Sequence, residues 1–296
     1  MRVRIFLAMV LAFGVAAPGA AQIVNETQFF PVVAHTEGAG DPPTSWRTDL
    51  TVHNVMDAEL TVGVQFLPSD QANNLEEVTV EELILDPRET LTIEDVVATL
   101  FGITTNAKGA LLLMCDAETY PANPEDATML ATTRTYNVGS AVGTFGTSVP
   151  GVPFNGIIFN AGQSISLITG VRNDSDYRSN LGIVNISFAG VPITVHYRFL
   201  DQDGIEIAIG SKDLDEYTMD QWSFRNLGVP RVFVGPLTVE LWLDPEDVPP
   251  GDVCEQNEDD LVLFVAYATK VDGNPTGSGD GEFIYAASVV DPDCGK

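Results

Sequence analysis

Histidine is the residue type best suited to acid–base or metal chemistry near neutral pH, and this chain contains three. They are His35, His53 and His196, and no two of them have the spacing of a metal-binding pair such as H-E-x-x-H. The sequence also lacks the G-x-S-x-G turn of serine hydrolases and the glycine-rich loops that bind nucleotide phosphates. We therefore expect no catalytic residue of these kinds, and we expect His53 and His196 to be solvated on the outer faces of strands.

Carboxylates are the most numerous reactive groups, with 42 Asp and Glu residues. Two of them could hydrolyse a glycoside only if they faced each other across a cleft, roughly 5–10 Å apart, and no motif indicates such a pair. Acidic loops could instead hold Ca²⁺, which binds six to eight oxygen atoms. No cluster has the EF-hand pattern, so we interpret them as solvated turns and keep calcium binding as an alternative to a chain without cofactors. The clusters are Asp174 and Asp176; Asp201 and Asp203; Asp244, Glu246, Asp247 and Asp252; and Glu255, Glu258, Asp259 and Asp260.

Two arginines occupy equivalent places, each directly after an aromatic residue. Arg47 follows Trp46, and Arg178 follows Tyr177. One interpretation is a grip on an anion or carboxylate, and the other is an ion pair with an Asp or Glu of the same domain. We favour the ion pair. Farther along the same two segments, Asn54 and Asn185 are expected to be strand-end turn residues whose side chains bond the local backbone.

These arginines and asparagines belong to a longer internal repeat. Four blocks recur in the same order with conserved aromatic, apolar and polar positions, which indicates a tandem duplication. The matched blocks are Trp46–Asn54 with Tyr177–Asn185, Leu60–Leu67 with Ile193–Leu200, Gly109–Cys115 with Gly235–Leu241, and Ala131–Thr135 with Ala266–Lys270.

The repeated blocks have the pattern of β-strands. In both Leu60–Leu67 and Ile193–Leu200 apolar residues alternate with polar ones, so we expect one buried and one solvated face. Asp203-Gly204 between two such runs predicts a type I′ hairpin. We expect about seven or eight strands per copy, and thus an all-β chain of two tandem immunoglobulin-like antiparallel β-sandwiches.

One segment has helical spacing instead. Between Ile93 and Phe101 the apolar residues fall on one face of a helix. Thr92 could cap its start and Gly102 could end it, so we expect one short helix in the first sandwich. The second copy has only Trp222–Gly228 there, which predicts a shorter turn.

The first 21 residues have the three regions of a secretory signal peptide: basic residues, an apolar stretch and small residues before Gln22. We therefore expect a secreted protein of the extracellular space, cell surface or periplasm. The expected domains are a first sandwich at 22–150, a linker at 151–162 and a second sandwich at 163–296. No later segment has the roughly 20 apolar residues of a membrane helix, so we expect no membrane insertion of the mature chain.

The charge balance excludes some partners. The chain has 14 Lys and Arg against 42 Asp and Glu, a formal net charge of −28, and 45% hydrophobic residues. Removing the signal peptide takes away two arginines and no acid. This charge argues against nucleic acid and anionic membrane surfaces as partners, because both require a basic face.

Three motifs also resemble those of secreted tandem β-sandwich proteins of environmental bacteria. They are Phe29–His35 (F-F-P-V-V-A-H), the Trp46–Asn54 run, and Thr133–Asn137 (T-R-T-Y-N). The second copy departs from the last motif at Ala268–Asp272. The resemblance implies a secreted pair of β-sandwiches and no particular activity.

Three cysteines permit at most one disulfide within the chain. Cys115 closes a strand pattern and is expected to be a small buried residue. If the last two strands form a hairpin, Cys254 and Cys294 lie at the same end of the second sandwich. We expect them to form a disulfide in an oxidising compartment, the alternative being that Cys294 pairs in a dimer.

These observations favour a secreted, non-enzymatic structural or binding module, with an extracellular protein or glycan as its partner. A secreted hydrolase, or an accessory subunit of one acting on extracellular polysaccharide, is the second hypothesis. A calcium-stiffened surface stalk is the third.

Overall fold

The computed structural model describes residues 24–38, 44–116, 127–139, 144–153, 165–187, 190–231, 233–243, 262–272 and 281–288. The expected signal peptide, most of the expected linker, the two acidic clusters from Asp244 onward, and both Cys254 and Cys294 lie outside these residues. The described part is almost entirely antiparallel β-structure, as expected. None of its helices is long and apolar enough to cross a membrane.

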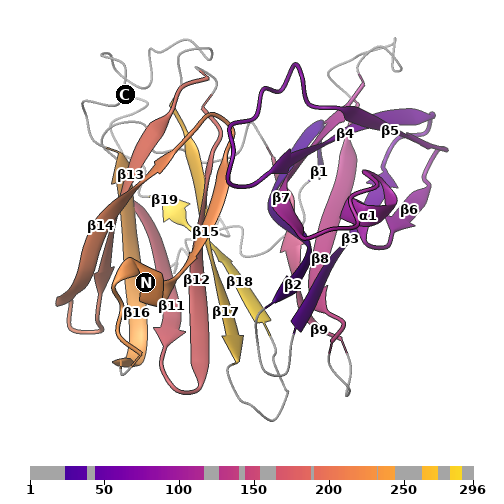
Figure 1. Cartoon of the computed structure of the whole chain (residues 1–296). Coiled ribbons are helices and arrows are strands. Elements are labelled where there is room, and N and C mark those ends of the chain that lie inside the picture. Colours follow the sequence, from indigo (N-terminus) through magenta and orange to yellow (C-terminus); the bar gives the residue numbers. More distant parts are fainter. Residues whose placement is uncertain are drawn as a thin grey trace, which may run out of the picture.

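The first half of the chain forms two facing sheets, which the pairing of the end of β2 with β3 joins at one edge into a continuous ten-stranded sheet (Figure 1). In one sheet β3 pairs with β6 and β8, and β8 pairs with β1 and β9. In the other, β7 pairs with β2 and β4, β4 pairs with β5, and β2 pairs with β10. The elements are β1 Val24–Asn25, β2 Thr27–Gly38, β3 Thr44–Asn54, β4 Leu60–Pro68, β5 Val80–Leu85, β6 Thr90–Ile93, α1 Val96–Thr99, β7 Ala107–Cys115, β8 Met129–Asn137, β9 Phe145–Pro150 and β10 Val152–Pro153.

The second half also forms two sheets. Their strand orders are β15-β12-β17-β18 and β14-β13-β16-β11-β19. The elements are β11 Ser166–Asn173, β12 Tyr177–Asn185, β13 Ile193–Leu200, β14 Glu206–Leu214, β15 Met219–Ser223, the 3-10 helix η3 Phe224–Leu227, β16 Phe233–Leu243, β17 Phe264–Asp272, β18 Gly281–Tyr285 and β19 Ala287–Ser288.

The main strand pairings of the first half recur in the second. β3 with β8 corresponds to β12 with β17, and β4 with β7 corresponds to β13 with β16. The order differs from the standard immunoglobulin sandwich, in which strands A, B, E and D share one sheet and C, F and G the other. Here the first long strand of each half, β2 or β11, lies in the sheet that corresponds to C and F. The last long strands, β8 and β17, lie in the sheet that corresponds to B and E.

The expected alternation of buried and solvated residues holds for one repeated strand and fails for the other. β13 alternates buried and partly exposed residues along its whole length, because its sheet has one face toward solvent. In β4 the second face is also covered: Gln65 is 2% exposed and Leu67 is 1% exposed. β4 belongs to a sheet that packs against the other half of the chain.

The expected helix is shorter than its apolar pattern. α1 spans only Val96–Thr99, and Thr92 lies in β6, where its hydroxyl bonds the hydroxyl of Thr51 on β3. The capping expectation was wrong because strand pairing with β3 extends through Ile93. Gly102 does end the turn as expected, with a left-handed φ of 67° and its N–H bonded to the carbonyl of Ala98.

The hairpin at Asp203-Gly204 joins β13 to β14, but it is not type I′. Only Gly204 has a positive φ, whereas type I′ needs two such residues. The reason is that the carboxylate of Asp201 accepts the N–H groups of Asp203 and Ile205. This Asx turn keeps the φ angle of Asp203 negative.

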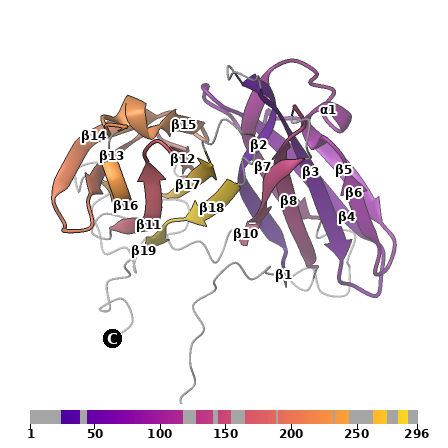
Figure 2. The same ribbon diagram turned by 90° about the horizontal axis from the view of Figure 1, so that it is seen from below.

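The two halves share a third hydrophobic core in addition to one core inside each sandwich. It lies between the β2–β7–β4 sheet and the β15–β12–β17–β18 sheet, which face each other in Figures 1 and 2. The first half contributes Phe29 and Leu112, among others, and the second contributes Val265 and Tyr267. The two middle sheets are therefore buried on both faces.

This double burial had a signal in the sequence that the alternation argument missed. Strands buried on both faces have continuous apolar runs rather than alternating ones. Such runs occur at 29–34, 110–114 and 262–268, and every residue of each run except Pro31 and Met114 belongs to the buried hydrophobic core. Gly182 on β12 serves the same packing, because a Cβ there would collide with the ring of Tyr267.

Polar contacts also cross between the halves. Asn73, in the β4–β5 connection, donates its backbone N–H to the carbonyl of Glu216 and its side-chain amide to that of Tyr217, both at 2.9 Å. The hydroxyl of Thr218 donates to the carbonyl of Gln71 at 2.7 Å. At the other end, the hydroxyl of Tyr285 donates to the carbonyl of Pro150 at 2.8 Å. Hydrogen bonds thus flank the shared core on both sides.

Separating the halves should expose this core. We expect a fragment of residues 22–150 to bind a hydrophobic dye and to self-associate, because Phe29, Leu67 and Leu112 would face water. The same fragment carrying Leu67→Lys and Leu112→Lys should remain monomeric. Dye fluorescence and analytical ultracentrifugation measure both. A wild-type fragment that is monomeric and binds no dye would contradict the shared core.

Candidate functional site

The hairpin of β2 and β3 presents polar residues on two opposite faces. Its register pairs Thr36 with Trp46 and Glu37 with Ser45. Because side chains alternate along a strand, neighbouring residues serve different sites. Trp46 and Thr36 line a cleft between the two halves, whereas Arg47 and Glu37 join a network of charged groups beside α1.

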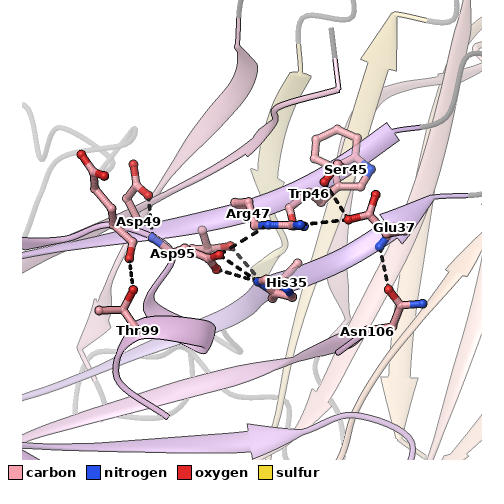
Figure 3. Close-up of polar contacts among 12 residues, drawn as sticks. His35, Glu37, Ser45, Trp46, Arg47, Asp49, Asp95, Thr99 and Asn106 are labelled. Carbon is pink, nitrogen blue, oxygen red and sulfur yellow. Dashed lines mark hydrogen bonds and ion pairs between the residues drawn. The ribbon is translucent and has the colours of Figure 1, made fainter. Parts of the chain in front are cut away.

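The network links His35, Arg47 and two carboxylates (Figure 3). The ring Nδ1 of His35 lies 2.8 Å from Oδ2 of Asp95, and Nε of Arg47 lies 3.4 Å from the same oxygen. Arg47 also donates from Nη2 to Oε1 of Glu37 at 2.9 Å and from Nη1 to the carbonyl of Trp46 at 2.7 Å. The side chain of Arg47 is only 19% exposed, so its charge is satisfied within the protein.

The position of Asp95 is fixed by its backbone conformation and by a hydrogen bond from its N–H group. It adopts a left-handed conformation with φ 46°, which Asp tolerates better than most residues, and its N–H donates to Oδ1 of Asp49 at 3.0 Å. The hydroxyl of Tyr136 donates to the same oxygen of Asp49. Burial, followed by this bond, raises the pKa of Tyr136 to about 12. The hydroxyl therefore stays protonated and keeps donating across the physiological range.

The His35–Asp95 pair resembles two members of a catalytic triad, but a nucleophile is needed to complete one. Within the described residues no serine, threonine or cysteine side chain is hydrogen-bonded to His35. The carboxylate of Asp95 is shared with Arg47 rather than reserved for the imidazole. The arrangement therefore ties β2, β3 and the start of α1 together.

The opposite face of the hairpin lines a cleft of about 430 Å³ between the halves. This volume lies in the range that small-molecule sites occupy. The first half contributes residues of β2, β3, β7, β8 and β9, and the second contributes residues of β12, β15, β17 and β18. The cleft thus exists only because the shared core fixes the two sandwiches side by side.

The lining combines aromatic rings with neutral polar groups. Trp46 and Phe283 supply the rings, and Phe283 is itself stacked on Tyr267 with ring centroids 4.8 Å apart. Amide side chains come from Asn180 and Gln221. Hydroxyl groups come from Thr36, Thr44, Thr135, Thr147, Ser223 and Thr269. Such a surface offers donors and acceptors around an apolar floor.

The two repeat-equivalent arginines have different surroundings. Arg47 makes the ion pairs described above. Arg178 is exposed and lines the cleft, and no described residue forms a hydrogen bond or ion pair with it. The sequence predicted the same ion-pairing role for both arginines. It could not distinguish them, because the acids that pair with Arg47 come from distant segments whose positions only the structure gives.

The repeat-equivalent asparagines have matching surroundings. Asn54 is fully buried and donates its amide to the carbonyls of Ala58, Leu85 and Asp86, while its side-chain oxygen accepts the N–H of Met56. Asn185 makes the corresponding bonds to Val191, Leu214, Asp215 and Ser187. The sequence predicted only local backbone partners. The structure adds the end of a strand about 30 residues away, so each asparagine closes one end of its sandwich.

The other residues singled out in the sequence lie apart from the cleft. His53 bonds the hydroxyl of Thr90, and His196 stacks on Trp242 with ring centroids 5.6 Å apart. Asp174 accepts the N–H groups of Asp176 and Tyr177 and pairs with Arg172. Among the described residues no group of three or more His, Cys, Asp or Glu could hold a metal ion.

Cys115 carries a free thiol, and burial raises its pKa to about 12. At neutral pH this thiol is therefore protonated and a poor nucleophile.

A pair of acids bridges the halves beside the cleft. Asp70 follows β4 and Asp220 lies in β15, and the two carboxyl groups share a hydrogen bond. Burial, followed by the bond and charge of Asp70, raises the pKa of Asp220 to about 7, although Lys108 and Lys212 oppose the shift. The bond from Asp220 lowers the pKa of Asp70 in turn. The sequence gave no sign of this pair, because its members are 150 residues apart.

Comparisons with known proteins do not assign this site. No protein-family model and no curated protein matches the chain. Among solved structures, Thermotoga maritima 1070 is 16% identical, covering 45% of this chain and 97% of its own, with a TM-score of 0.33. A candidate secreted protein from Parabacteroides distasonis is 11% identical over 81% of this chain and 70% of its own, with a TM-score of 0.22. Bacteroides uniformis beta-glucuronidase 2 is 9% identical over 82% of this chain and 26% of its own, with a TM-score of 0.15. At these TM-scores the structures support no argument about fold or activity.

The two arginines provide a matched test of the network. Arg47→Met should lower the free energy of unfolding by about 1–3 kcal/mol, because it removes the guanidinium from the partly buried carboxylate of Asp95. Arg178→Met should change it by less than about 0.5 kcal/mol, as expected for an exposed side chain. Urea denaturation of both variants measures the difference. Equal effects would show that the network does not depend on Arg47.

The acid pair predicts a pH dependence of stability. The folded chain keeps a proton on Asp220 up to about pH 7, whereas the unfolded chain releases it near pH 4. Stability from this group is therefore lost as the pH rises through 7. Thermal unfolding at pH 6 and pH 8 should show this decline in the wild type and a smaller one in Asp220→Asn. Asp213→Asn, at an exposed position, is the control and should show the same decline as the wild type. If Asp220→Asn also declines as much as the wild type, Asp220 does not hold this proton.

Proposed function

We propose that this chain is a secreted, non-enzymatic binding module of the extracellular space or cell surface. In this proposal its two halves are duplicated β-sandwiches that are immunoglobulin-like in architecture, though not in strand order. The signal-peptide pattern of residues 1–21, the acidic composition and the resemblance to secreted tandem β-sandwich proteins support the location. No nucleic acid or membrane surface is among the proposed partners.

The observation that carries the proposal is the cleft between the halves. It is lined by the half-buried Trp46, the ring of Phe283, two amide side chains and a series of hydroxyl groups. Sugars present apolar ring faces and many hydroxyl groups, each of which donates and accepts. An aromatic floor surrounded by amides and hydroxyls complements both features, so we propose an extracellular glycan as the ligand.

An enzymatic role has less support. The carboxylate of Asp95 is engaged by both His35 and Arg47. Among the described residues that line the cleft, the one carboxylate is that of Glu282, which is paired with Lys270 at 2.8 Å. Hydrolysis of a glycoside needs two carboxyl groups facing the scissile bond. We therefore propose binding without cleavage.

Trp46 tests the proposal directly. A panel of neutral and acidic oligosaccharides would be titrated into the mature protein by isothermal calorimetry. We expect Trp46→Ala to weaken the binding of any ligand at least about tenfold, because it removes an aromatic ring that lines the cleft. Trp242→Ala is the matched control, since that ring stacks on His196 in a different sheet. Equal affinities of Trp46→Ala and the wild type would contradict the proposed site.

A further inference from the structure

The charged groups of the cleft leave one positive charge unbalanced. Three charged side chains line it: Lys108, Arg178 and Glu282. Lys108 lies 3.6 Å from a carboxylate oxygen of Asp70, and Glu282 is paired with Lys270. Arg178 alone faces the cleft without a counter-ion among the described residues. This is unexpected in a chain with three times as many acids as bases.

The repeat shows that this arginine is not a structural requirement of the sandwich. Its equivalent, Arg47, forms ion pairs with Glu37 and Asp95 and a hydrogen bond to the carbonyl of Trp46. Arg178 occupies the same place in the pairing of its sheet, opposite Val271 as Arg47 is opposite Tyr136. The second sandwich folds with this guanidinium exposed, so its charge is available to a ligand.

Guanidinium groups bind carboxylates through two parallel N–H···O bonds, which gives both affinity and geometric selectivity. The cleft is also much larger than a small inorganic anion. Its remaining surface is the aromatic, amide and hydroxyl lining described above. A ligand that satisfies all these groups has a hydroxylated ring with an apolar face and one carboxylate.

We propose that the cleft binds one uronic acid residue of an extracellular glycan, with its carboxylate on Arg178 and its sugar ring against Trp46. This inference rests on the proposed glycan-binding function and specifies its ligand. Asn180 and Thr269, which bond each other at 3.2 Å and line the cleft, flank Arg178 on the same sheet and would bond the ring hydroxyls.

The experiment compares acidic sugars with uncharged derivatives of the same backbone. Oligogalacturonate, oligoalginate and hyaluronan fragments would be titrated into the mature protein, each alongside its methyl ester. Cello-, xylo- and chito-oligosaccharides complete the panel. At least one free acid should bind about ten- to a hundredfold more tightly than its ester.

Two substitutions assign the effect to one side chain. Arg178→Gln should abolish the preference for the acid over the ester, and Arg178→Lys should retain part of it, because the charge remains without the forked geometry. Arg231→Gln removes an exposed arginine outside the cleft and should bind like the wild type. Arg178→Gln is not expected to unfold the protein, and thermal unfolding of each variant verifies this.

The other outcomes separate the inference from the proposed function. Acid and ester binding equally, with binding still lost in Trp46→Ala, would overturn the uronic acid inference and leave glycan binding intact. Binding of peptides with a free terminal carboxylate, but of no uronic acid oligosaccharide, would overturn it in favour of a protein partner. No binding of any sugar in the panel would contradict both.

Discussion

The structure depends on two sheets that are buried on both faces. Each sandwich uses one face of its inner sheet for its own core and the other face for the core between the halves. Leu112 and Tyr267, which lie on the faces between the halves, are buried when the halves pack together. A chain with such a high negative charge must overcome repulsion between its halves, and burial of these apolar faces opposes it. The arrangement of the cleft follows from that packing.

Because side chains alternate along the β2–β3 hairpin, one of its faces supports the fold and the other lines the cleft. Odd-numbered residues such as His35 and Arg47 face charged partners and hold α1 against the strands. Even-numbered residues such as Thr36 and Trp46 face the second half across the cleft. A single hairpin therefore contributes both a rigid support and a ligand-facing surface. The second half supplies the other wall, where Arg178, which corresponds to Arg47 in strand pairing, has no acidic partner among the described residues.

Much of the fold follows from sequence patterns that act over short distances. The repeat identified the paired strands, and the alternation in β13 matches its burial because that strand belongs to an outer sheet. The same reasoning failed for β4 and for Thr92, where packing of the halves and pairing with β3 override the local pattern. The cleft was not predictable, because its residues come from nine strands of both halves and become neighbours only through the shared core. Likewise, no local pattern distinguishes Arg178 from Arg47.

Native-state hydrogen exchange tests the shared core most directly. As denaturant is added, the backbone amides of β7 and β17 should exchange through one common unfolding event, with the same free energy and the same denaturant dependence. That result is expected because both strands have one face in the core between the halves. If the amides of β7 and β17 instead open in two separate events with different free energies, the halves are independent domains, and the cleft between them has no fixed geometry.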